Sequence, residues 1–356
     1  MTSALPRLTI AGSGRYVPGK PVTNDALARV MDTSHDWIFQ RTGIAARHYA
    51  PDGVGVSDLA VPASLAALES AGLTPRDVDY ILFNTMTPDY LLPGSGTLLG
   101  AKLGIPGVPA LDLRQQCAAI PFSLQVADGL LQSGAARRLL LVSAEAHAGF
   151  MPWKDWALLE EGTGGAPNAA DYELATKHRG VSVLFGDGSG ALVLTAAERP
   201  GSGLLGVCTH SDGTHHDALR ISAGGFRSRP FLAQEMLDRG DQFPSMDGRE
   251  LFRAAIKKLP ETVRELCAAH DVALSDVDWF VAHQANDRIN ASVRDALGVP
   301  ASKVPSNIAR YGNTSTASIP ILTDELRRSG QLREGQLICF FAIGAGLNWG
   351  AALLRL

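Results

Sequence analysis

Cysteine, histidine and asparagine at three separate places in this chain offer the groups of an enzyme with a thiol nucleophile. Cys117 follows the strand-like run 111–113 and begins a helical stretch, so its thiol lies at a helix N-terminus. The unpaired N–H groups and the positive end of the helix dipole there lower the pKa of a thiol and favour the thiolate. A lone cysteine is by itself more often a small core residue, so this assignment depends on its partners.

His283 and Asn313 are the candidate partners of that thiol. His283 stands where a buried strand (280–282) ends and a helix begins. Open α/β sheets place their sites at such carboxyl ends of strands. Asn313 lies in the run 311–315 and begins another helical stretch. Each has an ordinary alternative, since a histidine can simply be packed and an asparagine is a good N-cap. Together with Cys117 they predict a catalytic site.

An internal repeat explains how these residues meet. The run Val78–Phe83 recurs as Val277–Ala282, 199 positions later, and Cys117–Gly134 resembles Asn313–Gly330, 196 positions later. The chain is therefore expected to contain two copies of one set of β and α elements. In that arrangement the asparagine occupies the position of the cysteine in the other half, and a pseudo-twofold axis brings the two helix starts together.

Short buried strands alternate with helical patterns over most of the chain, which predicts α/β sheets covered by helices on both faces. One helical pattern is 56–70, with Gly72 as the residue that ends it. The two halves are expected to span 1–198 and 199–356, joined near 195–203. The strand-like runs are 8–10, 80–83, 110–113, 139–142, 181–185, 191–194, 280–282, 337–341 and 350–354.

The stretch 151–180 interrupts the repeat. It contains Trp153, Trp156, a glycine-rich run at 162–167 and the basic run 177–179. A long connection of this kind is usually functional. We expect an insertion at about 150–180 that is partly helical and covers a site or an interface.

Four runs rich in glycine or histidine invite a functional interpretation. Gly186–Gly190 lies between two expected strands and lacks the Lys-Ser/Thr of a phosphate loop, so we predict a turn; Gly12–Gly14 lacks the third glycine of a dinucleotide fingerprint. His210–Asp217 lacks regular ligand spacing, and we expect no metal. Gly344–Gly350 is either a plain hairpin or a turn whose backbone presents an N–H to a developing oxyanion.

Composition excludes several classes of function. The 356 residues are 19% charged with a net charge of −4, and the absence of a basic stripe argues against nucleic-acid binding. No apolar run approaches the length of a membrane span, and Met1–Arg7 lacks the pattern of a signal segment. The four cysteines form no CxxC pair and are too sparse for a disulfide framework. We expect a cytoplasmic enzyme.

These residues together resemble the thiolase-fold condensing enzymes, specifically the β-ketoacyl-acyl-carrier-protein synthase III family. The resemblance covers nearly the whole chain. It implies a thiolase-like α/β fold of two duplicated βαβαβαββ halves in five layers, α-β-α-β-α, and a homodimer. The similar motifs are Asp32–Ile38, Arg41–Ile44, the turn before Cys117, Phe185–Ala191, Ser211–Gly213, His283–Asn286, Tyr311–Ser315 and Gly344–Gly350.

The resemblance implies a role for each catalytic candidate. Cys117 would attack an acyl thioester and hold the acyl group. His283 and Asn313 would donate hydrogen bonds to the thioester carbonyl of a malonyl substrate and stabilise the enolate formed as carbon dioxide leaves. The backbone N–H groups of Cys117 and Ala345 would form the oxyanion hole. The chemistry requires no cofactor and no metal.

Substrate-binding candidates also follow from the resemblance. Trp37 resembles a residue that stacks on the adenine of coenzyme A, although a core tryptophan is an alternative, and Arg41 belongs to the neighbouring motif. Arg249 and Phe252 resemble the stretch beside the pantetheine arm. Arg288 is a candidate for contact with an acidic acyl carrier protein, or else a solvated charge.

The chain departs from the family pattern near the expected acyl pocket. Ala119-Ile120 replaces a Gly-Phe pair, and Leu92 stands where other members have phenylalanine, or a glutamate base in long-chain head-to-head condensing enzymes. A leucine cannot act as a base, and it leaves more room for a long or branched acyl chain. In a homodimer Leu92 would border the partner's pocket. These departures suit a specialised member.

The sequence therefore predicts an acyltransferase that condenses an acyl thioester with a malonyl thioester, with loss of carbon dioxide, through an acyl-cysteine. The product would be a 3-oxoacyl thioester in fatty-acid or polyketide biosynthesis. An alternative is transfer of the acyl group to an alcohol or amine without condensation, for which His283 would act as a general base. A non-catalytic subunit that binds acyl chains is disfavoured by the intact Cys117, His283 and Asn313. The acyl donor is carried by coenzyme A or by a carrier protein.

Overall fold

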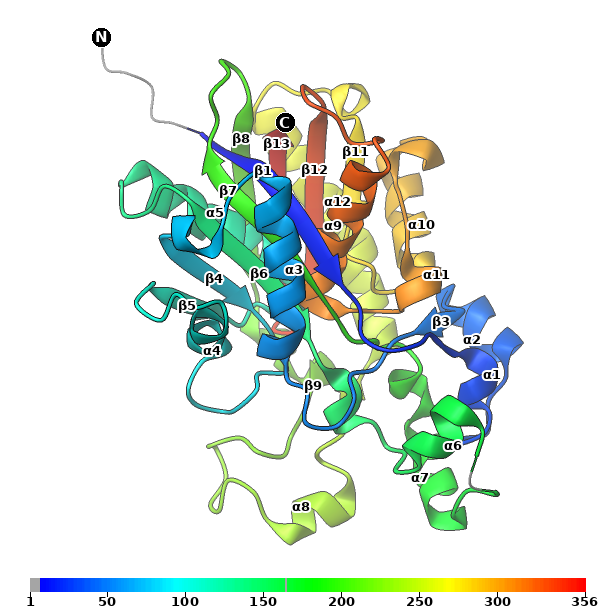
Figure 1. Ribbon diagram of the computed structural model, residues 1–356. Helices are drawn as coiled ribbons and strands as arrows, with labels where there is room; N and C mark the ends of the chain where they lie inside the picture. The colour runs from blue at the N-terminus through cyan, green and yellow to red at the C-terminus, as the bar shows by residue number, and fades with distance from the viewer. Residues whose placement is uncertain (1–6, 164) are drawn as a thin grey trace.

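The computed structural model describes residues 7–163 and 165–356. The expected absence of a signal segment concerns Met1–Arg7, of which only Arg7 lies within this range. Gly164, in the expected insertion, also lies outside it. Two mixed sheets form the framework (Figure 1). The first has the order β1 (Leu8–Tyr16), β7 (Gly188–Ala196), β6 (Leu139–Glu145), β4 (Tyr80–Asn84), β5 (Ala110–Leu113). The second has the order β11 (Trp279–Ala282), β12 (Leu337–Gly344), β13 (Asn348–Arg355), β8 (Gly203–Ser211).

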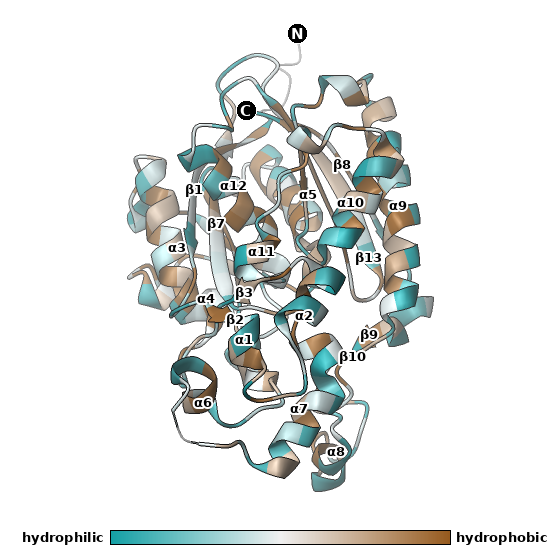
Figure 2. Ribbon diagram, turned by 90° about the vertical axis from the view of Figure 1, so that its right-hand side faces the viewer, coloured by the Kyte–Doolittle hydropathy of each residue, from teal (hydrophilic) through white to brown (hydrophobic). Residues whose placement is uncertain are grey.

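Helices cover both sheets on both faces. Figure 2 shows the layers nearly edge on, with α5 and α12 between the sheets and α3 and α9 on opposite outer sides. The outer layer of the first sheet is α3 (Val56–Ser70) and α4 (Ser95–Lys102), the central layer is α5 (Ala119–Gln132) and α12 (Ser318–Arg328), and the outer layer of the second sheet is α9 (Gly248–Ala269) and α10 (Asp287–Leu297). The expected five-layered thiolase-like fold is confirmed.

Burial on both faces explains why the central strands are almost continuously apolar. In β12, Ile338 and Phe340 pack in the core cluster between the sheets, whereas Cys339 and Phe341 pack in the cluster against α9. Successive side chains of a strand point to opposite faces, so both alternating sets must be apolar here. This is why the strand at 337–341 appears in the sequence as a continuous apolar run and not as alternating apolar and polar residues.

Glycines in β1 allow α3 to pack against the strand backbone. A Cβ at Gly12 would lie 2.3 Å from the carbonyl oxygen of Ala67, and one at Gly14 would lie 2.3 Å from that of Ala63. Any larger residue would push the helix away from the sheet. The run that resembles part of a dinucleotide fingerprint thus serves packing.

When the elements of the two halves are matched, the difference between their residue numbers changes along the central helices. Elements of the second half begin 199 positions after their counterparts at β4 and β11 (80 and 279) and at α5 and α12 (119 and 318). Because α12 has 11 residues and α5 has 14, the shift falls to 196 at the helix ends. The prediction that Asn313 occupies the position of Cys117 is therefore wrong, and the counterpart of Cys117 is Thr316.

Backbone strain confirms this corrected alignment. Gln116 and Ser315 have positive φ values of 50° and 47°, and each begins a short 3-10 turn before its central helix. A positive φ is uncommon outside glycine. Two non-glycine residues with that conformation at matched positions mark the same turn in both halves.

Three expectations about strands need correction. The run 181–185 is not a strand, because α7 (Ala169–Ser182) extends into it; a short apolar run is ambiguous between helix and strand. Residues Gly188–Gly190, expected in a turn, begin strand β7. Within the described residues, the second sheet has four strands instead of the five that a repeated βαβαβαββ half implies, because the segment between α10 and α12 forms no strand at Lys303–Pro305. Pro305 has no N–H to contribute to a ladder there.

Connections at one end of the two sheets form a small additional layer, seen at the bottom of Figures 1 and 2. The insertion is partly helical, as expected, and Trp153 packs with Leu27, Met31 and Tyr49. No helix in the described part of the chain is both long enough and apolar enough to cross a bilayer. The elements of this layer are β2 (Val22–Thr23), α1 (Asn24–Leu27), α2 (His35–Thr42), β3 (Ala46–Arg47), α6 (Trp156–Glu161), α7, β9 (Leu219–Arg220), α8 (Gln234–Arg239) and β10 (Ser245–Met246).

Candidate active site

A cavity of about 960 Å³ lies where the two halves meet. It is bordered by the turn before α5, the start of α9, the residues after β11 and the turn between β12 and β13. The predicted residues that line it are Cys117, His283, Asn313, Ala345, Arg41, Arg249, Phe252 and Arg288. The fold thus brings together all three catalytic candidates from segments about 170 and 30 residues apart in the sequence.

The strained turn before α5 holds Cys117 at the cavity. Its 3-10 turn, Gln116–Ala118, leads directly into the helix, and the thiol is 3.3 Å from the hydroxyl of Ser315 in the matching turn of the second half. Gly344 packs against this turn so closely that a Cβ there would lie 2.8 Å from the backbone nitrogen of Cys117. The nucleophile candidate is therefore positioned by both halves.

Burial dominates the pKa of this thiol. Desolvation raises the pKa of Cys117 to about 12; the Ser315 hydroxyl opposes the rise, and the negative charge of Glu145 adds to it. The prediction that the helix start lowers the pKa is thus wrong for the unliganded protein, because the buried thiolate loses more hydration than the turn replaces. At neutral pH Cys117 is a thiol that must lose its proton when it attacks.

His283 is a neutral imidazole. Its backbone N–H donates to the carbonyl of Phe341, and burial lowers the pKa of the ring to about 3. Since burial removes the hydration that would stabilise the imidazolium, the ring is uncharged at pH 7 and carries a single N–H. It can accept a proton from an acid at the cavity, or donate one hydrogen bond, but not both at the same nitrogen.

The hydroxyl of Ser318 decides which nitrogen of His283 carries the proton. Its oxygen lies 2.7 Å from Nδ1 of His283 and 3.0 Å from the carbonyl oxygen of Ser315. When the hydroxyl donates to Ser315, Nδ1–H of His283 donates to Ser318 and Nε2 is a base. When the hydroxyl turns to Nδ1, Nε2 carries the hydrogen and is a donor. Both tautomers are supported by one rotation.

Asn313 is held as a hydrogen-bond donor. Its Oδ1 accepts from the backbone N–H of Ser315 at 2.8 Å, which leaves the amide NH₂ as its remaining polar group. Its own backbone bonds to Leu184 and Gly186. Asn313 therefore also caps the 3-10 turn Ser315–Ala317, as its ordinary alternative implied, and the NH₂ group that lines the cavity is left over from that bond.

The turn between β12 and β13 presents a backbone N–H in the cavity that Cys117 also lines. The side-chain amide of Asn348 donates to the carbonyl of Ala345 at 2.7 Å, and Asp212 and Leu347 exchange two backbone hydrogen bonds at 2.8 Å. Among the described residues, no acceptor is found for the N–H of Ala345. A fixed and free N–H is what an oxyanion hole requires.

Comparison with known proteins agrees with this geometry. Models of the 3-oxoacyl-[acyl-carrier-protein] synthase III family match residues 111–213 and, for its C-terminal part, residues 267–356. The β-ketoacyl-[acyl-carrier-protein] synthase III of Rhodospirillum rubrum is 39% identical over 355 residues, covering 98% of this chain and 99% of the relative. The chain belongs to the β-ketoacyl-[acyl-carrier-protein] synthase III family. It is a condensing acyltransferase of this type.

Solved structures of synthase III proteins share the fold. The enzyme from Aquifex aeolicus is 34% identical with a TM-score of 0.83, covering 98% of this chain and 100% of that one. The priming β-ketosynthase of a polyketide pathway is 30% identical with a TM-score of 0.83, covering 100% of this chain and 98% of that one. The similarity extends over the whole framework that positions the cavity.

Sequence reasoning missed a buried carboxylate that joins the halves of this synthase III fold. Glu145, at the end of β6, is completely buried. It accepts from the hydroxyls of Thr87 and Thr316 at 2.8 Å and from the backbone N–H of Met86 at 3.1 Å. The only sequence signal was an acidic residue at the end of the apolar run 139–145. Ser315 and Ser318 were missed because hydroxyl contacts across the halves leave no spacing pattern.

Several arginine side chains line the cavity. Besides the predicted Arg41, Arg249 and Arg288, the lining includes Arg114, Arg220 and Arg253. Guanidinium groups suit phosphates and carboxylates. The lining of this synthase III member therefore combines apolar side chains such as Phe252 with several arginines.

Two predicted substrate contacts lie outside the cavity lining. The guanidinium groups of Arg41 and Arg179 stand 4.6 and 4.9 Å from the ring centre of Trp37. Arg179 comes from α7 in the insertion, so the insertion packs beside the expected adenine site. Leu92 is 77% exposed and is not among the residues that line the catalytic cavity. Ile120, expected near the acyl pocket, is buried in the core between the sheets.

Proposed function

We propose that Cys117, His283 and Asn313 catalyse a decarboxylative Claisen condensation between an acyl thioester and a malonyl thioester. The observation that carries the proposal is one cavity lined by a thiol from the first half and by an imidazole and an amide donor from the second. The free N–H of Ala345 in the same cavity supports the same chemistry.

The first step forms an acyl-cysteine. As Sγ of Cys117 attacks the thioester carbonyl, the thiol proton passes to Nε2 of neutral His283. The carbonyl oxygen becomes an oxyanion, which the N–H groups of Cys117 and Ala345 stabilise. Collapse breaks the bond to the carrier thiol, and His283 returns the proton to the leaving thiolate. The high pKa of Cys117 makes this coupled transfer necessary.

The second step forms the carbon–carbon bond. The malonyl thioester loses carbon dioxide, and the electron pair of the broken bond becomes an enolate whose oxygen accepts from the amide of Asn313 and from Nε2–H of His283. The enolate carbon attacks the acyl-cysteine carbonyl. Expulsion of the Cys117 thiolate releases the 3-oxoacyl product, and the thiolate takes up a proton. The two orientations of the Ser318 hydroxyl accommodate the two tautomers of His283, and conversion between the steps releases the Nδ1 proton to solvent and takes one up from solvent at Nε2.

The cavity lining supports a carrier with phosphate and pantetheine groups. Arg249 and Arg288 offer charge to phosphates or to an acidic carrier protein, and Phe252 offers apolar surface to a pantetheine arm. A purine placed on Trp37 would also contact Arg179, which already stands over that ring. We therefore propose that the acyl and malonyl groups arrive as thioesters of coenzyme A or of an acyl carrier protein, in fatty-acid or polyketide biosynthesis. The chemistry itself needs no cofactor.

We further propose a homodimer in the cytoplasm. Tyr90, Leu91 and Leu92 form an exposed apolar run of 62%, 62% and 77% exposure, which a second subunit would cover. In that dimer Leu92 would reach the partner's acyl pocket. All four cysteines are free thiols, which suits a reducing compartment.

Acyl transfer to an alcohol or amine is the second candidate. It needs only the orientation in which the Ser318 hydroxyl donates to the carbonyl of Ser315, which leaves Nε2 of His283 as a base. Release of carbon dioxide separates the two reactions, since only condensation produces it.

An Asn313→Ala variant tests the condensation. We expect acylation of Cys117 to persist within a few-fold, while carbon dioxide release and 3-oxoacyl product fall by about 10²–10³-fold, as for loss of an oxyanion donor. Asn168→Ala, at an exposed N-cap of α7, is the matched control. An ester or amide product from wild-type protein without carbon dioxide, for every malonyl donor offered, would overturn the proposal.

A further inference from the structure

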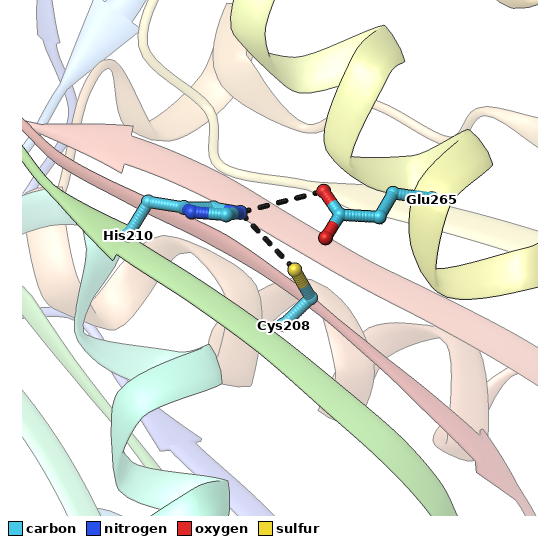
Figure 3. Close-up of side chains that lie close together, drawn as sticks. All are labelled: Cys208, His210 and Glu265. Carbon is cyan, nitrogen blue, oxygen red and sulfur yellow. Dashed lines mark hydrogen bonds and ion pairs between the residues drawn. The ribbon is translucent and has the colours of Figure 1, made fainter. Parts of the chain in front are cut away.

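A second cluster of reactive side chains lies away from the cavity, on the outer face of the second sheet. Cys208 and His210 are two residues apart on β8, so their side chains point to the same face. Glu265 reaches them from α9, which covers that face. Figure 3 shows the three side chains converging from the strand and the helix. None of them lines the catalytic cavity.

The contacts meet at one nitrogen. Sγ of Cys208 is 3.1 Å and Oε2 of Glu265 is 3.6 Å from Nε2 of His210, and the three ligand atoms lie within 4.8 Å of one another. A catalytic triad would place the carboxylate on the opposite ring nitrogen, Nδ1. Three ligand atoms around a common point are instead the arrangement that a metal ion requires.

The two separations from Nε2 of His210, 3.1 and 3.6 Å, fit a tetrahedral ion. Bond lengths of about 2.3 Å to sulfur and about 2.0–2.2 Å to nitrogen and oxygen put neighbouring ligand atoms roughly 3.3–3.6 Å apart. The contacts of His210 with Cys208 and Glu265 are close to that range. Thiolate, imidazole and carboxylate are all zinc ligands.

The scaffold restrains these ligands. The His210 ring stacks on Trp349 of the neighbouring strand, with ring centres 5.2 Å apart and an angle of 18°. Lys258 of α9 stands over Trp349, its Nζ 3.7 Å from the ring centre. His210 is 35% and Glu265 60% exposed, so an ion can enter from solvent.

We propose that Cys208, His210 and Glu265 bind a divalent metal ion of the zinc class, with water in the fourth position. Linear spacing within His210–Asp217 argued against a metal, but only His210 of that run takes part, and Glu265 is supplied by the fold. Binding deprotonates the Cys208 thiol and releases its proton to solvent. The ion joins α9 to β8 and is expected to stabilise that contact. The site does not depend on the proposed reaction.

Titration of the full-length, chelator-treated protein with zinc tests the site. We expect one equivalent to bind by calorimetry, with proton release, and the melting temperature to rise. Cobalt in place of zinc should give a thiolate-to-cobalt charge-transfer band together with the visible bands of tetrahedral cobalt. The Cys117→Ala variant should keep the band, because the catalytic thiol is not a ligand.

Ligand variants make the test specific. Cys208→Ser should remove the charge-transfer band and weaken zinc binding by more than the about 10- to 100-fold cost of second-shell changes, and His210→Gln and Glu265→Gln should weaken it as well. Glu261→Gln, an exposed residue one turn earlier on α9, is the matched control and should bind as wild type. Absence of stoichiometric binding, or binding unchanged in Cys208→Ser, would overturn the proposal.

Discussion

The two halves of this molecule use the same turn for different purposes. In the first half a strained residue, Gln116, precedes Cys117, whose side chain borders the cavity. In the second half the strained residue, Ser315, precedes Thr316, whose hydroxyl donates to Glu145 inside the protein. One turn presents a reactive group, and its counterpart anchors the interface between the halves.

Two further matched positions show the same division. His283 in the second half corresponds to Asn84 in the first, and Asn84 is fully engaged by the hydroxyls of Ser123 and Ser143 at 2.7 and 3.0 Å. Glu145 at the end of β6 corresponds to Gly344 at the end of β12. The glutamate holds the turn of the other half, whereas the glycine leaves room for the Cys117 backbone.

The duplicated fold therefore gives matched residues of the two halves equivalent positions, and the differences between those residues determine which of them can take part in the reaction. At each matched pair one member faces the cavity and the other satisfies buried polar groups. Buried polar groups cost free energy unless they are hydrogen-bonded. If one half carried the cavity-facing residue at all of these matched positions, the other half's buried polar groups at the interface would lack hydrogen-bond partners.

Moving the thiol to the matched position is the change with the largest expected effect. In the double variant Cys117→Ala and Thr316→Cys, we expect condensation to fall by about 10³-fold or more, as in Cys117→Ala alone. The reason is that the side chain at Thr316 points to Glu145 and does not line the cavity. Product formation is the measurement, with Thr316→Cys alone as control. Recovery of activity in the double variant would show that the two turns are equivalent.

Removing the carboxylate that joins the halves should cost stability. Glu145→Ala leaves the hydroxyls of Thr87 and Thr316 and the N–H of Met86 without their acceptor. We expect the free energy of unfolding to fall by about 3–5 kcal/mol, as when a buried charged network loses one partner. Urea denaturation measures it, and Glu160→Ala, on the exposed face of α6, is the control. Equal stability of the two variants would contradict the anchoring role.

The pH dependence of alkylation tests the environment of the first turn. Since burial raises the pKa of Cys117 to about 12, the thiolate fraction grows tenfold for each pH unit below that value. The rate of Cys117 alkylation by iodoacetamide, followed by peptide mass spectrometry, should rise about tenfold per pH unit between about pH 7 and 10. Ser315→Ala removes a hydrogen bond that lowers the pKa and should slow alkylation at each pH. A rate that levels off below pH 8 would indicate a stabilised thiolate instead.

Local patterns were sufficient to predict sheets covered by helices on both faces and the catalytic residue types, whereas the five layers were implied by the family resemblance. Apolar runs such as 139–142 and 337–341 fix strands because both faces are buried. Cys117, His283 and Asn313 were found because each stands at the boundary of a strand or helix. Both offsets, 199 and 196, were visible in the sequence, but not that the change between them falls inside α12, because a three-residue shortening inside a helix keeps its apolar period.

The energetics of the site were less predictable. The sequence places Cys117 at a helix start, but the depth of burial that raises its pKa depends on Gly344 and Ser315 of the other half. Cys208 and Glu265 are 57 positions apart, so their approach was equally invisible. Contacts between distant segments are properties of the fold.

Acylation of the intact protein tests the central claim, that one half supplies the nucleophile and the other the groups that act on the acyl acceptor. Wild-type protein is incubated with acyl-CoA donors of about two to sixteen carbons, a range that a cavity of this size can hold, and its mass is measured. We predict a single acyl adduct on Cys117 for at least one donor, absent from Cys117→Ala and retained in Asn313→Ala. An adduct that persists in Cys117→Ala, or an unmodified wild-type protein with every donor, would contradict the account.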